Sequence, residues 1–211
     1  MITAMDEDDL ALFDRWCAGD EAAGNALFKR HFESVFRFFE HKVDSEADEL
    51  VQETFLACLR DRDQFRRQSS FRTYLFAIAR HLLYGYWRKR STRPASLDFD
   101  EVTIASLSTS AGSRLAGGED RGRLLTALGE LPVEQQLLLE LHYWEELDRD
   151  QLAEVFDVAQ ATTRSRLFRA RQALRERLAD AAGDRARART DDALDDWARS
   201  LRAEAHGGEP E

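Results

Sequence analysis

Apolar residues recur at intervals of three and four along most of this 211-residue chain, and few residues interrupt the pattern. Only three prolines and eleven glycines occur, so helices can continue for several turns. We find no sustained alternation of apolar and polar residues of the kind that marks a β-strand. The sequence therefore predicts an all-α fold of two small helical domains joined by a flexible linker, the C-terminal one containing a helix-turn-helix.

The first two helices are expected at about residues 8–17 and 21–43. Asp20 precedes the second helix and is a suitable N-cap, because its carboxylate can accept a hydrogen bond from an unpaired backbone N–H of the first turn. The residues expected to face inward are Leu10, Phe13, Trp16 and Cys17 on the first helix, and Ala23, Leu27, Phe28, His31, Phe32, Val35, Phe36 and Phe39 on the second.

A third helix is expected after Ser45, whose spacing to Asp48 approximates a capping box. Its polar N-terminal end can be a solvated helix start, where the helix dipole favours acids, or a docking face for a partner. The expected apolar face comprises Leu50, Val51, Thr54, Phe55, Cys58 and Leu59, and the polar end comprises Glu46, Asp48, Glu49, Gln52 and Glu53.

The stretch from Phe65 to Arg90 combines a helical apolar stripe with many arginines and aromatic rings. Basic side chains hold phosphates, and exposed rings stack on unpaired bases, so the stretch is a candidate nucleic-acid site. The alternative is an ordinary packed helix with a solvated basic face. The whole chain has a formal net charge of −10, so any DNA contact must come from local patches. Ser69 or Ser70 can cap the helix, whose expected stripe is Phe71, Leu75, Ile78, Leu82 and Tyr86.

Residues 91–120 are rich in Ser, Thr, Ala and Gly and are expected to be a linker with one short apolar anchor, Val102-Ile104-Leu107. Beyond them, Pro132 should end one helix and lie in the first turn of the next. Asp148 and Gln151 form a capping-box pattern before a short helix.

A tight turn over residues 157–159 leads to the last helix, which is basic. Short helix, turn and basic helix together predict a helix-turn-helix, whose second helix would present its N-terminal residues to a major groove. The alternative is a basic helix that only packs. Its expected packing stripe is Leu167, Ala170, Leu174 and Leu178, and its expected base contacts come from Gln160, Thr162, Thr163 and Arg164.

Four stretches of this chain together resemble the extracytoplasmic-function (ECF) type of bacterial sigma-70-like RNA polymerase sigma factors. They are GDEAAGNALFKRHFESVFRFF, DELVQETFLACLRD, SSFRTYLFAIARHLLYGYWRKR and LPVEQQLLLELHYWEELDRDQLAEVFDVAQATTRSRLFRARQALRERL. The resemblance implies an N-terminal sigma domain over residues 8–90, a linker over 91–120 and a helix-turn-helix domain over 121–178. The acidic C-terminal extension, residues 179–211, lies outside the family pattern.

The resemblance also implies partners and sites. A sigma factor is a non-enzymatic subunit without a cofactor that binds core RNA polymerase (its β′ and β subunits) and promoter DNA. The implied polymerase-binding residues are Glu49, Leu50, Gln52, Glu53 and Phe55. The implied minus-ten element residues are Arg66, Arg67, Ser69, Ser70, Phe71, Arg72, Tyr74, Arg80, His81, Tyr84, Trp87, Arg88 and Lys89. The implied minus-thirty-five element residues are Gln160, Thr162, Thr163, Arg164, Arg166, Arg169 and Arg171.

Some positions depart from the family pattern. Glu49 and His81 replace the usual Asp and Asn, and Gly85 replaces an Asp within the promoter-melting helix. Asp157 replaces the usual turn Gly and can adopt the left-handed conformation that the turn needs, and Ala159 replaces the usual Ser cap.

The acidic extension contains an amphipathic pattern at Leu194, Trp197, Ala198 and Leu201. We hypothesise that it inhibits the protein by folding back on a DNA- or polymerase-binding surface; an anti-sigma factor is the other regulatory partner considered. The chain is expected in the bacterial cytoplasm, with no membrane insertion and no signal peptide.

Two other functions are weighed against the sigma factor. A stand-alone helix-turn-helix regulator would need neither the Arg/aromatic stretch nor the acidic docking helix. An enzyme is not favoured, because the chain lacks a phosphate-binding glycine loop and a nucleophile motif, and its five histidines are scattered. Cys17 and Cys58 lie far apart in sequence, so neither a disulfide framework nor a metal site is expected.

Overall fold

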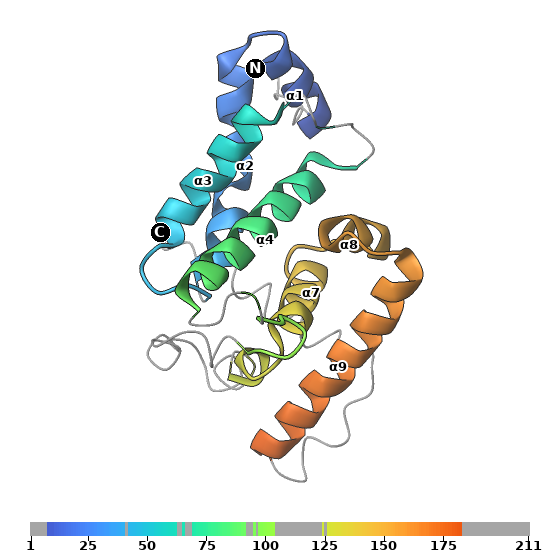
Figure 1. The fold of residues 1–211 in the computed structure, drawn as a ribbon. Coiled ribbons are helices and arrows are strands. Elements are labelled where there is room, and N and C mark those ends of the chain that lie inside the picture. The colour runs from blue at the N-terminus through green and yellow to red at the C-terminus, as the bar shows by residue number, and fades with distance from the viewer. Residues whose placement is uncertain are drawn as a thin grey trace, which may run out of the picture. The chain divides into compact units, whose positions relative to one another are not determined.

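The structure, a computed structural model, describes residues 8–40, 42–62, 65, 69–91, 95, 97–103, 124 and 126–182. Its main helices are α1 (Asp9–Cys17), α2 (Glu21–Glu40), α3 (Ala47–Arg60), α4 (Phe71–Arg90), α7 (Val133–Tyr143), α8 (Arg149–Phe156) and α9 (Gln160–Ala182) (Figure 1). The described residues form no strand, only an isolated bridge between Thr103 and Pro132. The all-α prediction is confirmed.

The chain divides into two compact units, an N-terminal one with α1 to α4 and a C-terminal one with α7, most of α8, and α9. In the N-terminal unit α4 packs against α3 and α2, and α1 packs against α2. The core residues of α4 are spaced four apart: Phe71, Leu75, Ala79, Leu83 and Trp87 are each at most 1% exposed.

This buried stripe differs from the predicted one. Ile78, Leu82 and Tyr86 are only half-buried, whereas Ala79 and Leu83 lie in the core. Both stripes share Phe71 and Leu75, and they separate at the small, fully buried Ala79. Side-chain size alone therefore favoured the wrong stripe.

Asp20 caps α2 as predicted, because its Oδ1 accepts a hydrogen bond from the backbone N–H of Ala23 at 3.1 Å. The helix ends at Glu40, earlier than the expected Val43. Within it, Phe32 is 47% exposed, and Phe28 and Phe36 are only half-buried, so the prediction that all three face fully inward is wrong. No other described helix covers this side of α2 completely.

The contact between α1 and α2 depends on one glycine and one ion pair. A Cβ atom on Gly24 would lie 2.5 Å from Cδ1 of Trp16, so the helices approach closely only because this position lacks a side chain. Asp9 lies 2.7 Å from both Arg30 Nη1 and His31 Nε2. Burial opposes ionisation of Asp9, but these two partners outweigh it and hold its pKa below the usual value.

On α1 the predicted inward face is only partly correct. Leu12 is buried beside Phe13 and Trp16, whereas Leu10 is 37% exposed and Cys17 is half-buried. On α3, Cys58 is fully buried, and burial raises the pKa of its thiol to about 12, so the thiol stays protonated at neutral pH.

The start of α3 also differs from the prediction. The N-cap is Glu46, without a side-chain cap bond, and Ser45 forms no capping box with Asp48. The Glu46 carboxylate accepts hydrogen bonds from the Ser45 backbone N–H at 3.0 Å and from Arg90 Nη1 at 2.8 Å. Arg90 also bonds Asp44 at 3.0 Å, so the end of α4 is attached to the loop before α3.

In the C-terminal unit, residues 97–103 close the start of α7. The carbonyl oxygens of Val102 and Phe99 accept hydrogen bonds from the backbone N–H groups of Val133 (2.9 Å) and Glu134 (3.0 Å), which an isolated helix would leave unsatisfied. Phe99 is buried, although the sequence did not single it out, and Val102 is half-buried. The other two predicted anchor residues, Ile104 and Leu107, lie outside the described residues.

Pro132 is the N-cap of α7, one position before the expected first turn. The capping box before α8 is confirmed: Asp148 Oδ1 accepts from the Gln151 N–H at 2.8 Å, and Gln151 Oε1 accepts from the Asp148 N–H at 2.9 Å. Asp157 adopts a left-handed φ of 53° in the turn between α8 and α9, as predicted. On α9, Leu167, Ala170 and Leu174 are buried, and Leu178 is half-buried.

Candidate functional site

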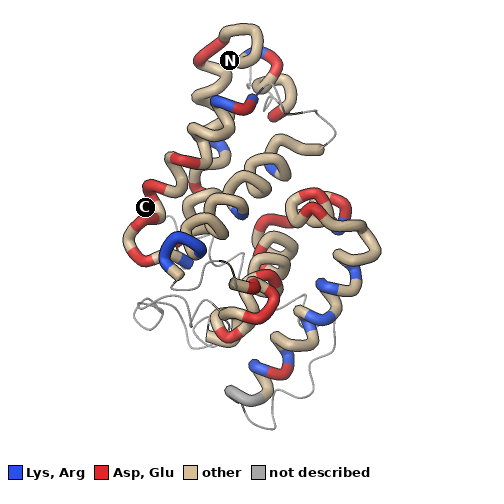
Figure 2. Tube along the Cα trace, viewed as in Figure 1, with Lys and Arg blue, Asp and Glu red and all other residues tan. Residues whose placement is uncertain are grey.

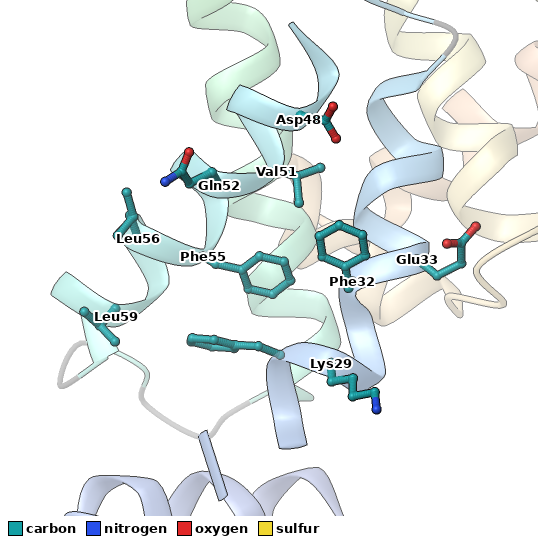
Figure 3. Close-up of a pocket in the computed structure, with 10 residues that line it drawn as sticks. Lys29, Phe32, Glu33, Asp48, Val51, Gln52, Phe55, Leu56 and Leu59 are labelled. Atoms are coloured by element: carbon teal, nitrogen blue, oxygen red, sulfur yellow. The ribbon is translucent and has the colours of Figure 1, made fainter. Parts of the chain in front are cut away.

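An open apolar groove of about 880 Å³ lies between α2 and α3 (Figure 3). Phe32 of α2 and Phe55 of α3 face one another across it, with nearly parallel rings and centroids 6.4 Å apart. Leu56 and Leu59 are 55% and 48% exposed along its α3 side. The lining residues are Phe28, Lys29, Phe32, Glu33, Asp48, Val51, Gln52, Phe55, Leu56 and Leu59.

The groove exists because each helix has a second apolar stripe. Phe28 and Phe32 lie one turn apart on α2, and Phe55 and Leu59 lie one turn apart on α3. The primary stripes of both helices are used in the core, so these secondary stripes meet at the open angle between the helices. Leu59 was predicted to face the core, and its exposure corrects that prediction.

The edge of the groove is mainly acidic. Glu33 and Asp48 line it, Lys29 is the one basic lining residue, and the exposed Glu49 and Glu53 follow on α3. Acidic side chains beside an exposed apolar stripe are suited to a partner that presents apolar groups flanked by basic ones.

The structure places the expected polymerase-binding residues in two environments. Glu49, Gln52 and Glu53 are exposed, and Gln52 and Phe55 line the groove. Leu50 is 5% exposed and belongs to the core. The sequence did not assign most of the groove residues to a partner, among them the exposed Phe32, Leu56 and Leu59. The available signal was that each helix carries more apolar residues than one core-facing stripe requires.

The expected minus-ten residues on α4 are mostly not exposed. Phe71 is fully buried, Trp87 is 1% exposed and Tyr84 is 6% exposed, so in this conformation they pack in the core and offer no face to a base. Their placement contradicts the expectation of exposed stacking rings. The aromatic residues of α4 instead fill the core of the N-terminal unit. This is the alternative considered from the sequence, an ordinary packed helix with a solvated basic face.

Other residues of that set are held by neighbours within the N-terminal unit. Tyr74 donates its hydroxyl hydrogen to the Asp61 carbonyl at 3.1 Å, and burial raises the pKa of Tyr74 to about 12. The guanidinium of Arg80 lies 4.8 Å from the Tyr84 ring centroid, and that of Arg72 lies 5.9 Å from the ring of Phe76.

The remaining members of the set divide by exposure. Ser70 caps α4, as its Oγ accepts from the Thr73 N–H at 3.1 Å, and Ser69 is half-exposed beside it. The exposed members are His81, Arg88 and Lys89. Arg66 and Arg67 lie outside the described residues. The structure therefore brings a basic C-terminal end of α4 to the surface, without the aromatic faces that were expected with it.

Basic residues on α9 extend along the helix (Figure 2). Gln160, Arg164 and Arg169 are exposed, and Thr162 is half-buried. Thr163 is fully buried, and its hydroxyl lies 3.5 Å from the Ala159 carbonyl, so the structure contradicts its expected base contact.

Two arginines of α9 are held inside the C-terminal unit. Arg171 donates from Nε to the Tyr143 hydroxyl at 2.9 Å, and its Nη2 lies 3.0 Å from Nε2 of His142. Arg166 lies 3.7 Å from Asp100 and 3.8 Å from Glu134 in longer ion pairs. Arg171 is therefore a packing residue in this structure, and the exposed basic face of α9 is concentrated in its first half.

The described residues contain no group of three His, Cys, Asp or Glu side chains placed to hold a metal ion. Likewise, none of the helices in the described part of the chain offers an apolar stretch long enough to cross a bilayer.

Comparisons with known proteins agree with these two units. The family model "Sigma-70 region 2" matches residues 27–93, which include α3 and α4, and "Sigma-70, region 4" matches residues 121–174, which include α7 and α8. Together they cover more than half of the chain. The chain belongs to the sigma-70 family of sigma factors.

Similar proteins indicate which type of sigma factor this chain is. ECF RNA polymerase sigma-E factors of Salmonella typhimurium strain LT2 and Escherichia coli K12 are each 28% identical to this chain over 175 residues, covering 79% of it and 92% of the relative. The protein is an ECF-type sigma factor. The family is non-enzymatic.

Solved structures share the fold. A sigma factor RpoE from Bartonella quintana, in complex with the anti-sigma factor NepR, matches with a TM-score of 0.55 and 25% identity, over 70% of this chain and 91% of that one. CnrH, in complex with the cytosolic domain of CnrY, matches with a TM-score of 0.60 and 22% identity, over 83% of this chain and 99% of that one.

Proposed function

We propose that this sigma factor binds core RNA polymerase through the α2–α3 groove and directs it to promoters, with the exposed basic residues of α4 and α9 contacting DNA. The observation that carries the proposal is the groove itself, because it joins polar residues expected to bind polymerase to an apolar surface that no described residue covers. The protein then acts in the bacterial cytoplasm, where polymerase and promoters are found.

The groove supplies both affinity and selectivity for a protein partner. Covering Phe32, Leu56 and Leu59 would remove apolar surface from water, at about 25 cal/mol per Å². The acidic side chains beside them would favour a partner with basic residues around an apolar ridge and disfavour an acidic one. Exposed apolar patches of this kind commonly mark protein interaction sites.

On the DNA side, the exposure pattern narrows the expected contacts. His81, Arg88 and Lys89 are the described α4 residues best placed to reach a promoter strand, and Gln160, Arg164 and Arg169 those of α9. Basic side chains bind phosphates without reading sequence, whereas Arg and Gln at the start of a recognition helix can also bond base edges. Minus-ten contact by the buried aromatics would require α4 or its surroundings to rearrange.

The docking step is tested with Leu56→Glu. Leu56 is more than half exposed, so the change leaves the core intact but places a charge in the groove. We expect binding to purified core polymerase to weaken at least tenfold, measured by fluorescence anisotropy of labelled sigma factor. Leu10→Glu is the matched control, because Leu10 is an exposed leucine of α1 that does not line the groove.

Equal affinity of the Leu56→Glu and Leu10→Glu variants for polymerase would refute the groove as the docking site. Absence of polymerase binding by the unchanged protein, together with tight binding to duplex DNA alone, would instead favour the helix-turn-helix regulator. We also propose an anti-sigma factor as a partner of this chain, because the similar sigma factor RpoE of Bartonella quintana was solved in complex with one.

A further inference from the structure

The exposed face of α9 is apolar at its centre and basic around it. Phe168 is 58% exposed, more than any other large apolar residue in the described part of the chain. Arg164 lies one turn before it and Arg169 is the next residue along the helix, both are exposed, and no carboxylate of the described residues forms an ion pair with either. An exposed aromatic ring between two available cations is a surface for an acidic, amphipathic partner as well as for DNA.

The chain itself contains such a partner beyond α9. Residues 191–201 read DDALDDWARSL, with four aspartates and with Leu194, Trp197 and Leu201 at spacings of three and four. In a helix, these spacings would place the three apolar side chains on one face with acids beside them. The segment therefore complements the α9 face in both charge and apolar character.

The connecting segment is long enough to bring the two together. From Ala182, the end of α9, back to Arg169 is 13 residues of helix, or about 20 Å at 1.5 Å per residue. Residues 183–190 can span up to about 27 Å when extended. Residues 191–201 as a helix would be about 16 Å long, close to the length of α9 from Arg169 back to Gln160.

The α2–α3 groove is the other apolar surface that this segment could cover, but charge argues against it. The groove is edged by Glu33 and Asp48, with Glu49 and Glu53 nearby, and these would repel a segment with four aspartates. The α9 face offers arginines instead.

We propose that residues 191–201 fold back on the Arg164–Phe168–Arg169 face of α9 and compete there with DNA. The identity of the competing ligand rests on the proposed function; the contact itself does not. Because the segment is tethered, we take its effective concentration at α9 to be on the order of 1 mM, so a contact with a dissociation constant below that value keeps the face mostly covered. Binding of DNA must then displace the segment, which lowers the apparent affinity.

The experiment compares the full chain with a chain ending at Ala182 and with a full-length D191N/D192N/D195N/D196N variant. The probe is a 20-base-pair duplex without promoter sequence, at low salt. We expect both altered chains to bind about tenfold more tightly than the full chain, with the difference shrinking as salt screens the contact. A Glu209→Gln/Glu211→Gln variant, which removes acids outside the segment, should bind like the unchanged protein.

A second readout needs no DNA. Amide hydrogen exchange of residues 191–201 should be slower in the unchanged protein than in a Phe168→Ser variant, whose substitution removes the exposed ring and leaves the core of α9 intact. Equal exchange in these two proteins, or equal or weaker DNA binding by the chain ending at Ala182, would overturn the proposal. Transcription assays with core polymerase separate the two proposals: a tail effect without promoter-dependent transcription by any variant would refute the proposed function alone.

Discussion

Helices α4 and α9 are both long and rich in arginine, yet they use their side chains in opposite ways. On α4 the aromatic residues fill the core of the N-terminal unit, and the exposed cations gather at its C-terminal end. On α9 small and aliphatic residues face the core, and a phenylalanine and several arginines remain exposed. Aromatic residues among arginines therefore do not by themselves indicate a surface that stacks on bases.

The largest expected difference is in the loss of stability when one aromatic residue of each helix is replaced by alanine. Trp87→Ala should lower the free energy of unfolding by about 3–5 kcal/mol, because it leaves a cavity at a position that is 1% exposed. Phe168→Ala on α9 should change it by less than about 0.5 kcal/mol. Urea unfolding followed by circular dichroism measures both. A small loss for Trp87→Ala would mean that α4 is not packed as described and that this ring is available to DNA.

The second-largest expected change in stability comes from comparing two arginines on α9. Arg171→Ala removes bonds to Tyr143 and His142 and should destabilise the C-terminal unit by about 1–2 kcal/mol. Arg169→Ala, two positions earlier and exposed, should leave stability nearly unchanged but weaken binding to a minus-thirty-five duplex. Thermal unfolding and DNA anisotropy on the same two variants separate these roles. Equal thermal stability of both variants would show that Arg171 is not a packing residue.

Gly85 tests the exposed side of α4. A Cβ added there meets no atom within 4 Å, so Gly85→Ala should stabilise the helix by about 0.5–1 kcal/mol. Gly24→Ala is the control that should destabilise the protein, because the added Cβ would collide with Trp16. If Gly85→Ala stabilises the protein but reduces transcription, the space beside Gly85 is used by a partner. A destabilising Gly85→Ala would contradict the open environment.

The smallest expected effect is the pH dependence of the anchor at the end of α4. The pKa of Glu46 is lowered by the Ser45 N–H, Tyr86 and Arg90, despite some desolvation. A lowered folded-state pKa means that the contribution is present above the usual carboxyl range and is lost as pH falls through the folded value. For this solvent-exposed pair we expect a few tenths of a kcal/mol.

The contribution of Glu46 is measured by comparing the unfolding midpoints of the unchanged protein and a Glu46→Gln variant at pH 7 and at pH 3. The difference between the two proteins should be present at pH 7 and disappear at pH 3. A difference that persists at pH 3 would mean that the charge of Glu46 does not support the contact.

Much of the fold could be predicted from local signals. The capping box at Asp148 and Gln151, the cap at Asp20 and the left-handed turn at Asp157 depend on neighbouring residues alone, so the sequence contains their cause. The exposure of Phe32 and Leu59 and the burial of Thr163 depend on which helices pack together, which local spacing does not encode. The same limit explains why the exposure of the polar residues Glu49, Gln52 and Glu53 on α3 could be predicted, whereas most of the groove residues were not singled out.

The carbonyl groups of Phe99 and Val102 accept hydrogen bonds at the start of α7. These bonds change how the expected linker, residues 91–120, should be regarded. Residues 97–103 and the helical turn at 126–129 both belong to the C-terminal unit, so the chain between them, residues 104–123, begins and ends on the same body. A change in its length is therefore a change within the C-terminal unit. An inserted tag or reporter there would leave the connection between the units untouched.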